Sequence, residues 1–226
     1  MPSLPGLGRT IARALAANGA SKVYVLGRRL EALTETASTN PGIIIPLVVD
    51  VTVKNTLVAA AARIREEVGY INFLVAAAGM VYLPSKPADI GSDSDSGPRS
   101  GISTNSNGRI QVGRALKPNP TATEIESFLL ATPEEEFLTS YLTNMMGVFY
   151  TIASFISLLD NGNKRGNVAW KSHVVAVSSI AGQHRYATGG CAYGMSKAAV
   201  LHCLRQMMTF LAPVDVRVNT VSPGSE

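Results

Sequence analysis

The chain has 226 residues, 46% of them hydrophobic and 16% charged, which suits one folded domain with a sizeable core and excludes a largely disordered protein. Its net charge of +4 is scattered, without a basic stripe interleaved with aromatic residues, so nucleic-acid binding is not expected. The two cysteines, Cys191 and Cys203, form no CxxC pair and no Cys/His cluster. Neither a metal site nor a disulfide framework is therefore predicted.

The sequence also predicts no membrane partner. The longest apolar run, FLVAAAGMVYL, is too short to cross a bilayer. The first residues lack a charged segment followed by an apolar core, which is the pattern of a signal peptide. A cytoplasmic protein is the expectation, unless a targeting segment is missing from the start of the chain.

Helical and strand patterns alternate along the chain. Apolar residues at helical spacing or in buried-type runs mark the elements. The predicted helices cover residues 8–20, 29–38, 55–68, 133–159 and 192–211. The predicted strands are KVYVLG (22–27), IIIPLVVD (43–50), INFLVAAAG (71–79), HVVAVSS (173–179) and DVRVNTVSPG (215–224).

This alternation predicts an α/β fold with a Rossmann-like, doubly wound parallel sheet. Strands that are apolar throughout and alternate with helices belong to parallel sheets covered on both faces. The right-handed crossover rule then gives the doubly wound arrangement, in which ligands bind at the carboxyl ends of the strands. Residues with special chemistry stand at these ends: Gly27, Asp50, Gly79, Ser178, Ser179 and Pro223.

One segment, residues 84–120, interrupts the alternation. It is rich in Ser, Gly and Pro and has almost no apolar content to bury. A connection of this length within a compact domain is usually disordered or a lid. We therefore interpret residues 1–226 as a single domain with a flexible insertion, and a substrate lid or docking tail remains the alternative for residues 84–120.

The strongest chemical pattern is SSIAG followed by YGMSK. Tyr193 and Lys197 are four residues apart, so a helix places them on one face. A nearby ammonium favours the phenolate and lowers the pKa of a tyrosine, which makes it a tunable proton donor for a carbonyl oxygen. Ser178 and Ser179 end a buried strand, where a hydroxyl could hydrogen-bond the same oxygen. Tyr-x-x-x-Lys alone is a weak motif, but this context makes it more specific.

Together these stretches resemble the short-chain dehydrogenase/reductase family. SSIAG with YGMSK is similar to the family's active-site motif, and VRVNTVSPG is similar to the strand and cofactor loop that follow it. NMMGVFY resembles the family's helix that carries a functional Asn. VVDVT resembles the segment that places an acidic residue near the adenine. The resemblance covers nearly the whole chain outside residues 84–120. It implies a nicotinamide cofactor and an oxidoreductase that interconverts a carbonyl and an alcohol.

The resemblance also assigns roles. Tyr193 would be the general acid in reduction and the base in oxidation, and Lys197 would lower its pKa and hold the nicotinamide ribose. Ser179 would position the carbonyl, with Ser178 as the weaker candidate, and Asn144 would hold a proton-relay water. The residues implied in cofactor binding are Gly6, Leu7, Gly8, Arg28, Asp50, Ala77, Gly79, Tyr193, Lys197, Pro223 and Gly224.

The turn after the predicted strand KVYVLG (22–27) favours NADP(H) over NAD(H). It reads LGRR, with Arg28 and Arg29 and no carboxylate to bind a ribose 2′-hydroxyl. A guanidinium can bind a 2′-phosphate through two parallel hydrogen bonds. The alternative is that both arginines are solvated residues at the start of a helix.

The sequence departs from the family pattern at three places. In the glycine turn, Met1 and Pro2 stand where Thr and the first Gly are expected, and no strand precedes them. Ala77 replaces an Asn after the third strand, and the chain stops at SPGSE before a substrate-covering segment. We interpret this as truncation at both ends, which is expected to leave neighbouring backbone groups unpaired or to rearrange the sheet.

These departures raise a second hypothesis, that of a non-catalytic protein of the same fold which binds or regulates a full-length relative. The helices at 133–159 and 192–211 would form its interface, because such helices often build a dimer interface in the family. The same helices would serve a homo-oligomer of an active enzyme. Binding to a nucleic acid or a membrane surface rests only on the basic pI of about 9.2 and on the basic residues of the insertion, and it is the weakest hypothesis.

Overall fold

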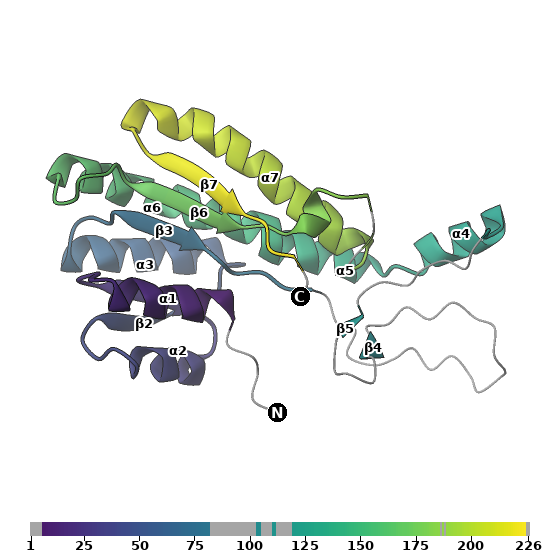
Figure 1. Ribbon diagram of the computed structural model, residues 1–226, viewed down its shortest axis with the longest axis horizontal. Helices are drawn as coiled ribbons and strands as arrows, with labels where there is room; N and C mark the ends of the chain where they lie inside the picture. The colour runs from purple at the N-terminus through teal and green to yellow at the C-terminus, as the bar shows by residue number, and fades with distance from the viewer. Residues whose placement is uncertain are drawn as a thin grey trace.

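Figure 1 shows the computed structural model, which describes residues 6–81, 103–104, 110–111, 119–185, 187 and 189–224. Each helix and strand predicted from the sequence is present, with its ends shifted by a few residues. The first half contains α1 (Leu7–Ala17), β1 (Val23–Gly27), α2 (Leu30–Ala37), β2 (Ile44–Val48), α3 (Lys54–Glu67) and β3 (Phe73–Ala76). The second half contains α4 (Ala122–Leu130), α5 (Glu134–Ser140), a π-helical turn (Tyr141–Met146), α6 (Gly147–Arg165), β6 (His173–Val177), α7 (Cys191–Leu211) and β7 (Arg217–Val221).

The parallel strands form two separate sheets. β1 pairs with β2, whereas β3, β6 and β7 form a second sheet with β6 in the middle. No described strand lies between β1 and β3, so each of these two strands has a backbone partner on one side only. The α/β fold class predicted from the sequence is confirmed, and the expected disturbance of the sheet takes the form of this split.

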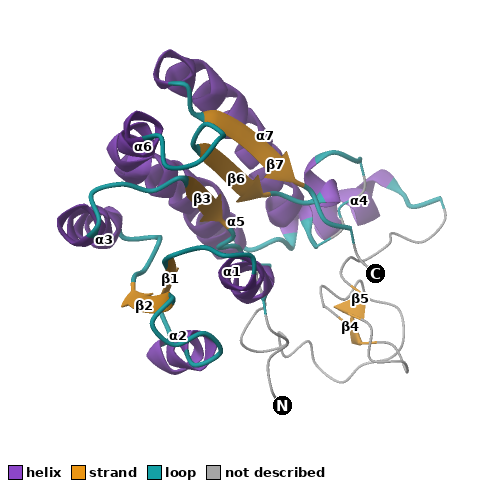
Figure 2. Cartoon of the chain, turned by 60° about the vertical axis from the view of Figure 1, so that its left-hand side comes forward, coloured by secondary structure: helices purple, strands orange, loops and turns teal. Residues whose placement is uncertain are grey.

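The helices are arranged in two layers. Figure 2 shows α1 and α2 on one face of the strands and α3, α6 and α7 on the other. The α6–α7 face is closely packed and buries Ile152, Val174 and Leu204. On the opposite face of β7, Arg217 and Asn219 are exposed. The prediction that strands are covered on both faces is therefore wrong for β7 within the described residues, because Val218 is the one buried residue of this strand.

The segments α5, the π-helical turn and α6 form one helical run from Glu134 to Arg165 (Figure 1). It extends six residues beyond the predicted end at residue 159. By length and composition this run could cross a membrane, although it contains no single long uninterrupted apolar stretch. Its side chains at Ile152, Phe155 and Leu158 are buried against the strands and α3, so its apolar composition is that of a core helix.

The predicted insertion at 84–120 lies mostly outside the described residues and remains a prediction. Its described part includes the antiparallel pair β4 (Ser103–Thr104) and β5 (Ile110–Gln111). The helix α4, which follows it, was not predicted from the sequence. Thr121 and Glu124 form a capping box at its start, with Thr121 N donating to Glu124 Oε2 at 2.8 Å. The Thr-x-x-Glu spacing was the sequence signal for this helix.

Candidate functional site

The site is built at the carboxyl ends of β3, β6 and β7, which run parallel and end at the same edge of their sheet (Figure 1). α7 packs along this sheet and begins beside that edge. Because residues four apart share one face of a helix, α7 presents Tyr193 and Lys197 together. The Lys197 Nζ atom lies 5.8 Å from the centroid of the Tyr193 ring.

Lys197 is a buried amine with a partner from the strand. The residue is 3% exposed, and Nζ donates a hydrogen bond to the Val177 carbonyl oxygen at 3.0 Å. Burial disfavours the charged form and lowers the pKa of Lys197 to about 8. The amine therefore changes charge close to neutral pH, which suits a group that tunes a neighbouring proton donor.

The Tyr193 ring is held by a glycine with left-handed backbone. Gly189 has a φ angle of 85°, and a Cβ atom built there would lie 2.5 Å from Tyr193 Cδ1. Any other residue would strain the backbone and displace the ring. The half-buried phenol is thus oriented by backbone packing as well as by the helix.

The two serines at the end of β6 have different tasks. Ser178 is buried, and its Oγ donates to the Lys197 carbonyl oxygen at 3.0 Å, which ties β6 to α7. Ser179 is half-buried, and its Oγ accepts from Ala181 N at 3.1 Å. The hydroxyl hydrogen of Ser179 has no acceptor among the described residues, so it is available to donate. This geometry favours Ser179 over Ser178 as the group that contacts a substrate.

Asn144 lies in the π-helical turn and is fully buried. Its Nδ2 donates to Met80 O and to Ser196 Oγ, both at 2.9 Å. Its Oδ1 accepts from Met80 N at 2.8 Å. Both amide hydrogens are therefore committed to protein partners, which leaves a single lone pair of Oδ1 for the relay water predicted from the family resemblance.

The glycine turn begins α1 beside the end of β3. Gly6 is the N-cap residue, and the first turn of α1 contains no acidic side chain. The backbone N–H groups of Leu7 and Gly8 have no acceptor among the described residues. A Cβ atom at Gly8 would lie 3.5 Å from the Ala77 Cβ, so this turn is adjacent to the strand end. Such a helix N-terminus can bind an anion.

The other predicted cofactor residues line the same edge. A Cβ atom at Gly79 would lie 3.0 Å from Lys197 Nζ, so the backbone there passes directly over the amine. The Pro223 carbonyl oxygen accepts from Ile180 N at 3.1 Å, and Gly224 lies beside the Ile180 side chain. The loop after β7 is thereby fixed next to the loop that contains Ser179.

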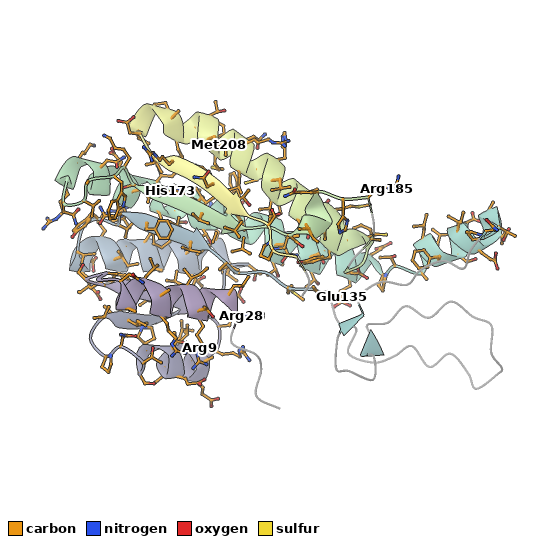
Figure 3. The ribbon with its side chains drawn as sticks, in the orientation of Figure 1. Arg9, Arg28, Glu135, His173, Arg185 and Met208 are labelled. Carbon is orange, nitrogen blue, oxygen red and sulfur yellow. The ribbon has the colours of Figure 1, made fainter. Side chains whose placement is uncertain are left out.

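Arg28 and Asp50 lie at the ends of β1 and β2, in the other sheet. Asp50 Oδ1 accepts from Thr52 Oγ1 at 2.7 Å and from Thr52 N at 2.9 Å. These bonds, and to a smaller extent the charge of Arg28, lower the pKa of Asp50. Arg28 is exposed, while Arg9 on α1 pairs with Glu35 at 2.7 Å; Figure 3 shows both arginines in this half of the molecule.

The comparisons with known proteins agree with this arrangement. The family model for short chain dehydrogenase matches residues 3–124 and 118–225. The chain belongs to the short-chain dehydrogenase/reductase family. It is 35% identical to the short-chain dehydrogenase/reductase PhomF' of Diaporthe leptostromiformis over 97% of the chain and 66% of that protein. It is 33% identical to VdtF of Byssochlamys spectabilis, over 97% of the chain and 69% of that protein.

Solved structures lead to the same fold. A short-chain type dehydrogenase/reductase from Mycobacterium marinum superposes with a TM-score of 0.69 at 26% identity, over 97% of the chain and 70% of that structure. The family member described here thus spans about two-thirds of the length of its relatives. The resemblance predicted from the motifs is confirmed.

Two components of this short-chain dehydrogenase/reductase site were not predicted from the sequence. Ser196 immediately precedes Lys197 and is three residues after Tyr193, so the helical spacing could have placed it on the inner face of α7. The π-helical turn that directs Asn144 inward had no sequence signal. No group of three or more His, Cys, Asp or Glu side chains in the described ranges is placed to hold a metal ion, and both cysteines are free thiols.

Proposed function

We propose that the chain is an NADP(H)-dependent oxidoreductase that interconverts a carbonyl and an alcohol. The observation that carries this proposal is the half-buried phenol of Tyr193 beside the buried amine of Lys197, 5.8 Å from the ring centroid, at the carboxyl edge of a parallel sheet. Membership of the short-chain dehydrogenase/reductase family supports the reaction class. The substrate is a small molecule with a ketone, aldehyde or secondary alcohol group.

The residues of the site suit proton transfer to and from the substrate oxygen. In reduction, Tyr193 donates the phenolic proton to the carbonyl oxygen, and Ser179 donates a hydrogen bond to the same atom. In oxidation, the Tyr193 phenolate takes the proton from the alcohol. The Lys197 ammonium favours the phenolate, and its hydrogen bond to Val177 O fixes its position. A bound nicotinamide cofactor supplies or accepts the hydride.

The described residues fit a dinucleotide phosphate cofactor. The exposed amides at the start of α1 would bind the pyrophosphate, and the glycine backbone at Gly79 leaves room over Lys197 for the nicotinamide ribose. Asp50 would lie near the adenine. The exposed cation of Arg28 and the lack of an acid directly after β1 support a 2′-phosphate rather than a free 2′-hydroxyl.

The first test is cofactor binding to the purified chain, with NADPH and NADH measured in parallel by fluorescence. NADPH is expected to bind more tightly. Turnover is then measured with a panel of ketones and aldehydes for the wild type, Tyr193→Phe and the control Tyr150→Phe. Tyr150 is a half-buried tyrosine on α6 that packs beside the core, outside the site. Loss of the proton donor is expected to reduce kcat by about 10²- to 10⁴-fold in Tyr193→Phe alone. Equal turnover in the two variants would refute the role of Tyr193.

A second candidate function is a non-catalytic binding partner of a full-length relative. The split between β1 and β3 favours it, because two strand edges lack partners within the described residues. Exposed apolar side chains on the two long helical runs, including Leu138 and Phe210, also suit an interface with a relative or a second copy. Sedimentation of the purified chain tests this. A monomer that turns over substrate would contradict the partner role.

For either function, we propose a cytoplasmic location.

A further inference from the structure

Ser196 lies at the centre of a buried hydrogen-bond network. It is fully buried on α7, between Tyr193 and Lys197. Its Oγ donates to the Tyr193 carbonyl oxygen at 2.7 Å and accepts from Asn144 Nδ2 at 2.9 Å. Asn144 in turn binds the backbone of Met80, accepting from its N–H and donating to its carbonyl oxygen. One hydroxyl thus connects α7, the π-helical turn and the loop after β3.

The direction of each hydrogen bond follows from the groups involved. A backbone carbonyl can only accept, so the single hydrogen of the Ser196 hydroxyl is used on Tyr193 O. The Ser196 oxygen can then only accept from Asn144, which must present its NH₂ group. The Asn144 amide oxygen is therefore left for Met80 N. Ser196 fixes which way the amide points, and the amide fixes the backbone of Met80.

We infer that Ser196 is a positioning residue: its hydroxyl orients the amide of Asn144, which holds the Gly79–Met80 backbone over Lys197. A Cβ atom at Gly79 would lie 3.0 Å from Lys197 Nζ and 3.4 Å from Asn144 Oδ1, so this backbone is in contact with both groups. Without the hydroxyl, one buried N–H of Asn144 loses its acceptor. The observed position of the Gly79–Met80 backbone then becomes less favourable, because local opening of this loop would let water accept a hydrogen bond from that N–H.

The chain offers a matched control one helical turn before Asn144. Ser140, the last residue of α5, is also fully buried, but its hydroxyl has no hydrogen-bond partner among the described residues. Ser140→Ala and Ser196→Ala both remove one buried hydroxyl, so their effects on volume and packing are alike. Only Ser196→Ala leaves a buried donor unpaired. The difference between the two variants isolates the hydrogen bond from the loss of atoms.

The test is amide hydrogen exchange by NMR on the full chain without ligand, for the wild type, Ser196→Ala and Ser140→Ala. The Met80 amide is expected to exchange about tenfold faster in Ser196→Ala, with amides of β6 such as Val175 unchanged. Ser140→Ala is expected to match the wild type. Unchanged exchange at Met80, an equal rise at Met80 and β6, or an equal rise in both variants would overturn the inference. If Ser196→Ala does not fold, Ser196→Cys, which replaces the hydroxyl with a larger thiol that forms weaker hydrogen bonds, is judged by the same criteria.

A second measurement addresses the role in the proposed function, on which this part of the inference rests. Because the Gly79–Met80 backbone lines the proposed ribose position, Ser196→Ala is expected to raise the Kd for NADPH by about three- to tenfold, whereas Ser140→Ala leaves it unchanged. Equal Kd values in wild type and Ser196→Ala would remove the cofactor role. If the wild type binds no NADPH, the proposed function fails, while the exchange experiment still decides whether Ser196 positions the loop.

Discussion

The two sheets of this molecule differ in how firmly they are held. The β3–β6–β7 sheet is covered by α6 and α7 and contains fully buried side chains such as Val174 and Ala176. In the β1–β2 sheet every residue of β1 is only half-buried, and Val48 of β2 is 60% exposed. The proposed proton-transfer groups belong to the first sheet and the proposed adenine-side residues to the second. The packing therefore holds the proposed proton-transfer groups more firmly than the residues that are proposed to select the cofactor.

The connection between the halves explains why the second sheet stays in place. Leu47 and Val49 pack with α3, and α3 packs on Phe155 and Leu158 of α6. This apolar cluster links β2 to the well-packed half without a strand between β1 and β3. On the other face, α1 contacts the end of β3 through Gly8 and Ala77. The relative position of the two sheets thus depends on helices rather than on backbone hydrogen bonds.

Two glycine variants are expected to give the largest difference between the halves. A Cβ atom at Gly182 would lie 2.7 Å from backbone atoms of Lys197 and Ala198, so Gly182→Ala would push α7 from the sheet edge. We expect it to lower the free energy of unfolding by about 3 kcal/mol. Gly8→Ala meets only an ordinary contact with Ala77 and is expected to keep or slightly raise stability. Denaturant unfolding measures both, and equal losses would show that α1 is packed as tightly as α7.

The sequence alone predicted the alternating elements and the chemical groups, since periodicity and the Tyr193–Lys197 spacing are local features. It placed Asn144 on the correct helix but not in a π-helical turn, because that turn depends on contacts with Met80 and Ser196 far along the chain. The sequence also did not reveal which face of β7 is exposed to solvent. An apolar run shows that a strand is buried somewhere, whereas the helices around it decide on which face.

The buried amine of Lys197, in the well-packed half, gives the next prediction, which is that the free energy of unfolding depends on pH. Burial lowers its pKa to about 8 in the folded chain, below the unfolded value of about 10.4. Between these values the unfolded state binds more protons, so stability contributed by this group rises with pH. From pH 7 to pH 10 the gain is expected to be about 2–3 kcal/mol relative to Lys197→Met. Chemical denaturation of both proteins at each pH measures it, and parallel curves would show that the amine is not desolvated.

A matched pair of strand valines gives the smallest expected effect and the most direct comparison of the two sheets. Val174 in β6 is completely buried, whereas Val48 in β2 is 60% exposed. Truncation to alanine removes the same two methyl groups from each strand. Val174→Ala is expected to cost about 2 kcal/mol, because it leaves a cavity between the sheet and α6–α7. Val48→Ala is expected to cost less than about 1 kcal/mol, which reflects mainly β-propensity. Equal costs would mean that Val48 is covered in solution, by another part of the chain or by a second copy, and that the two sheets are held alike.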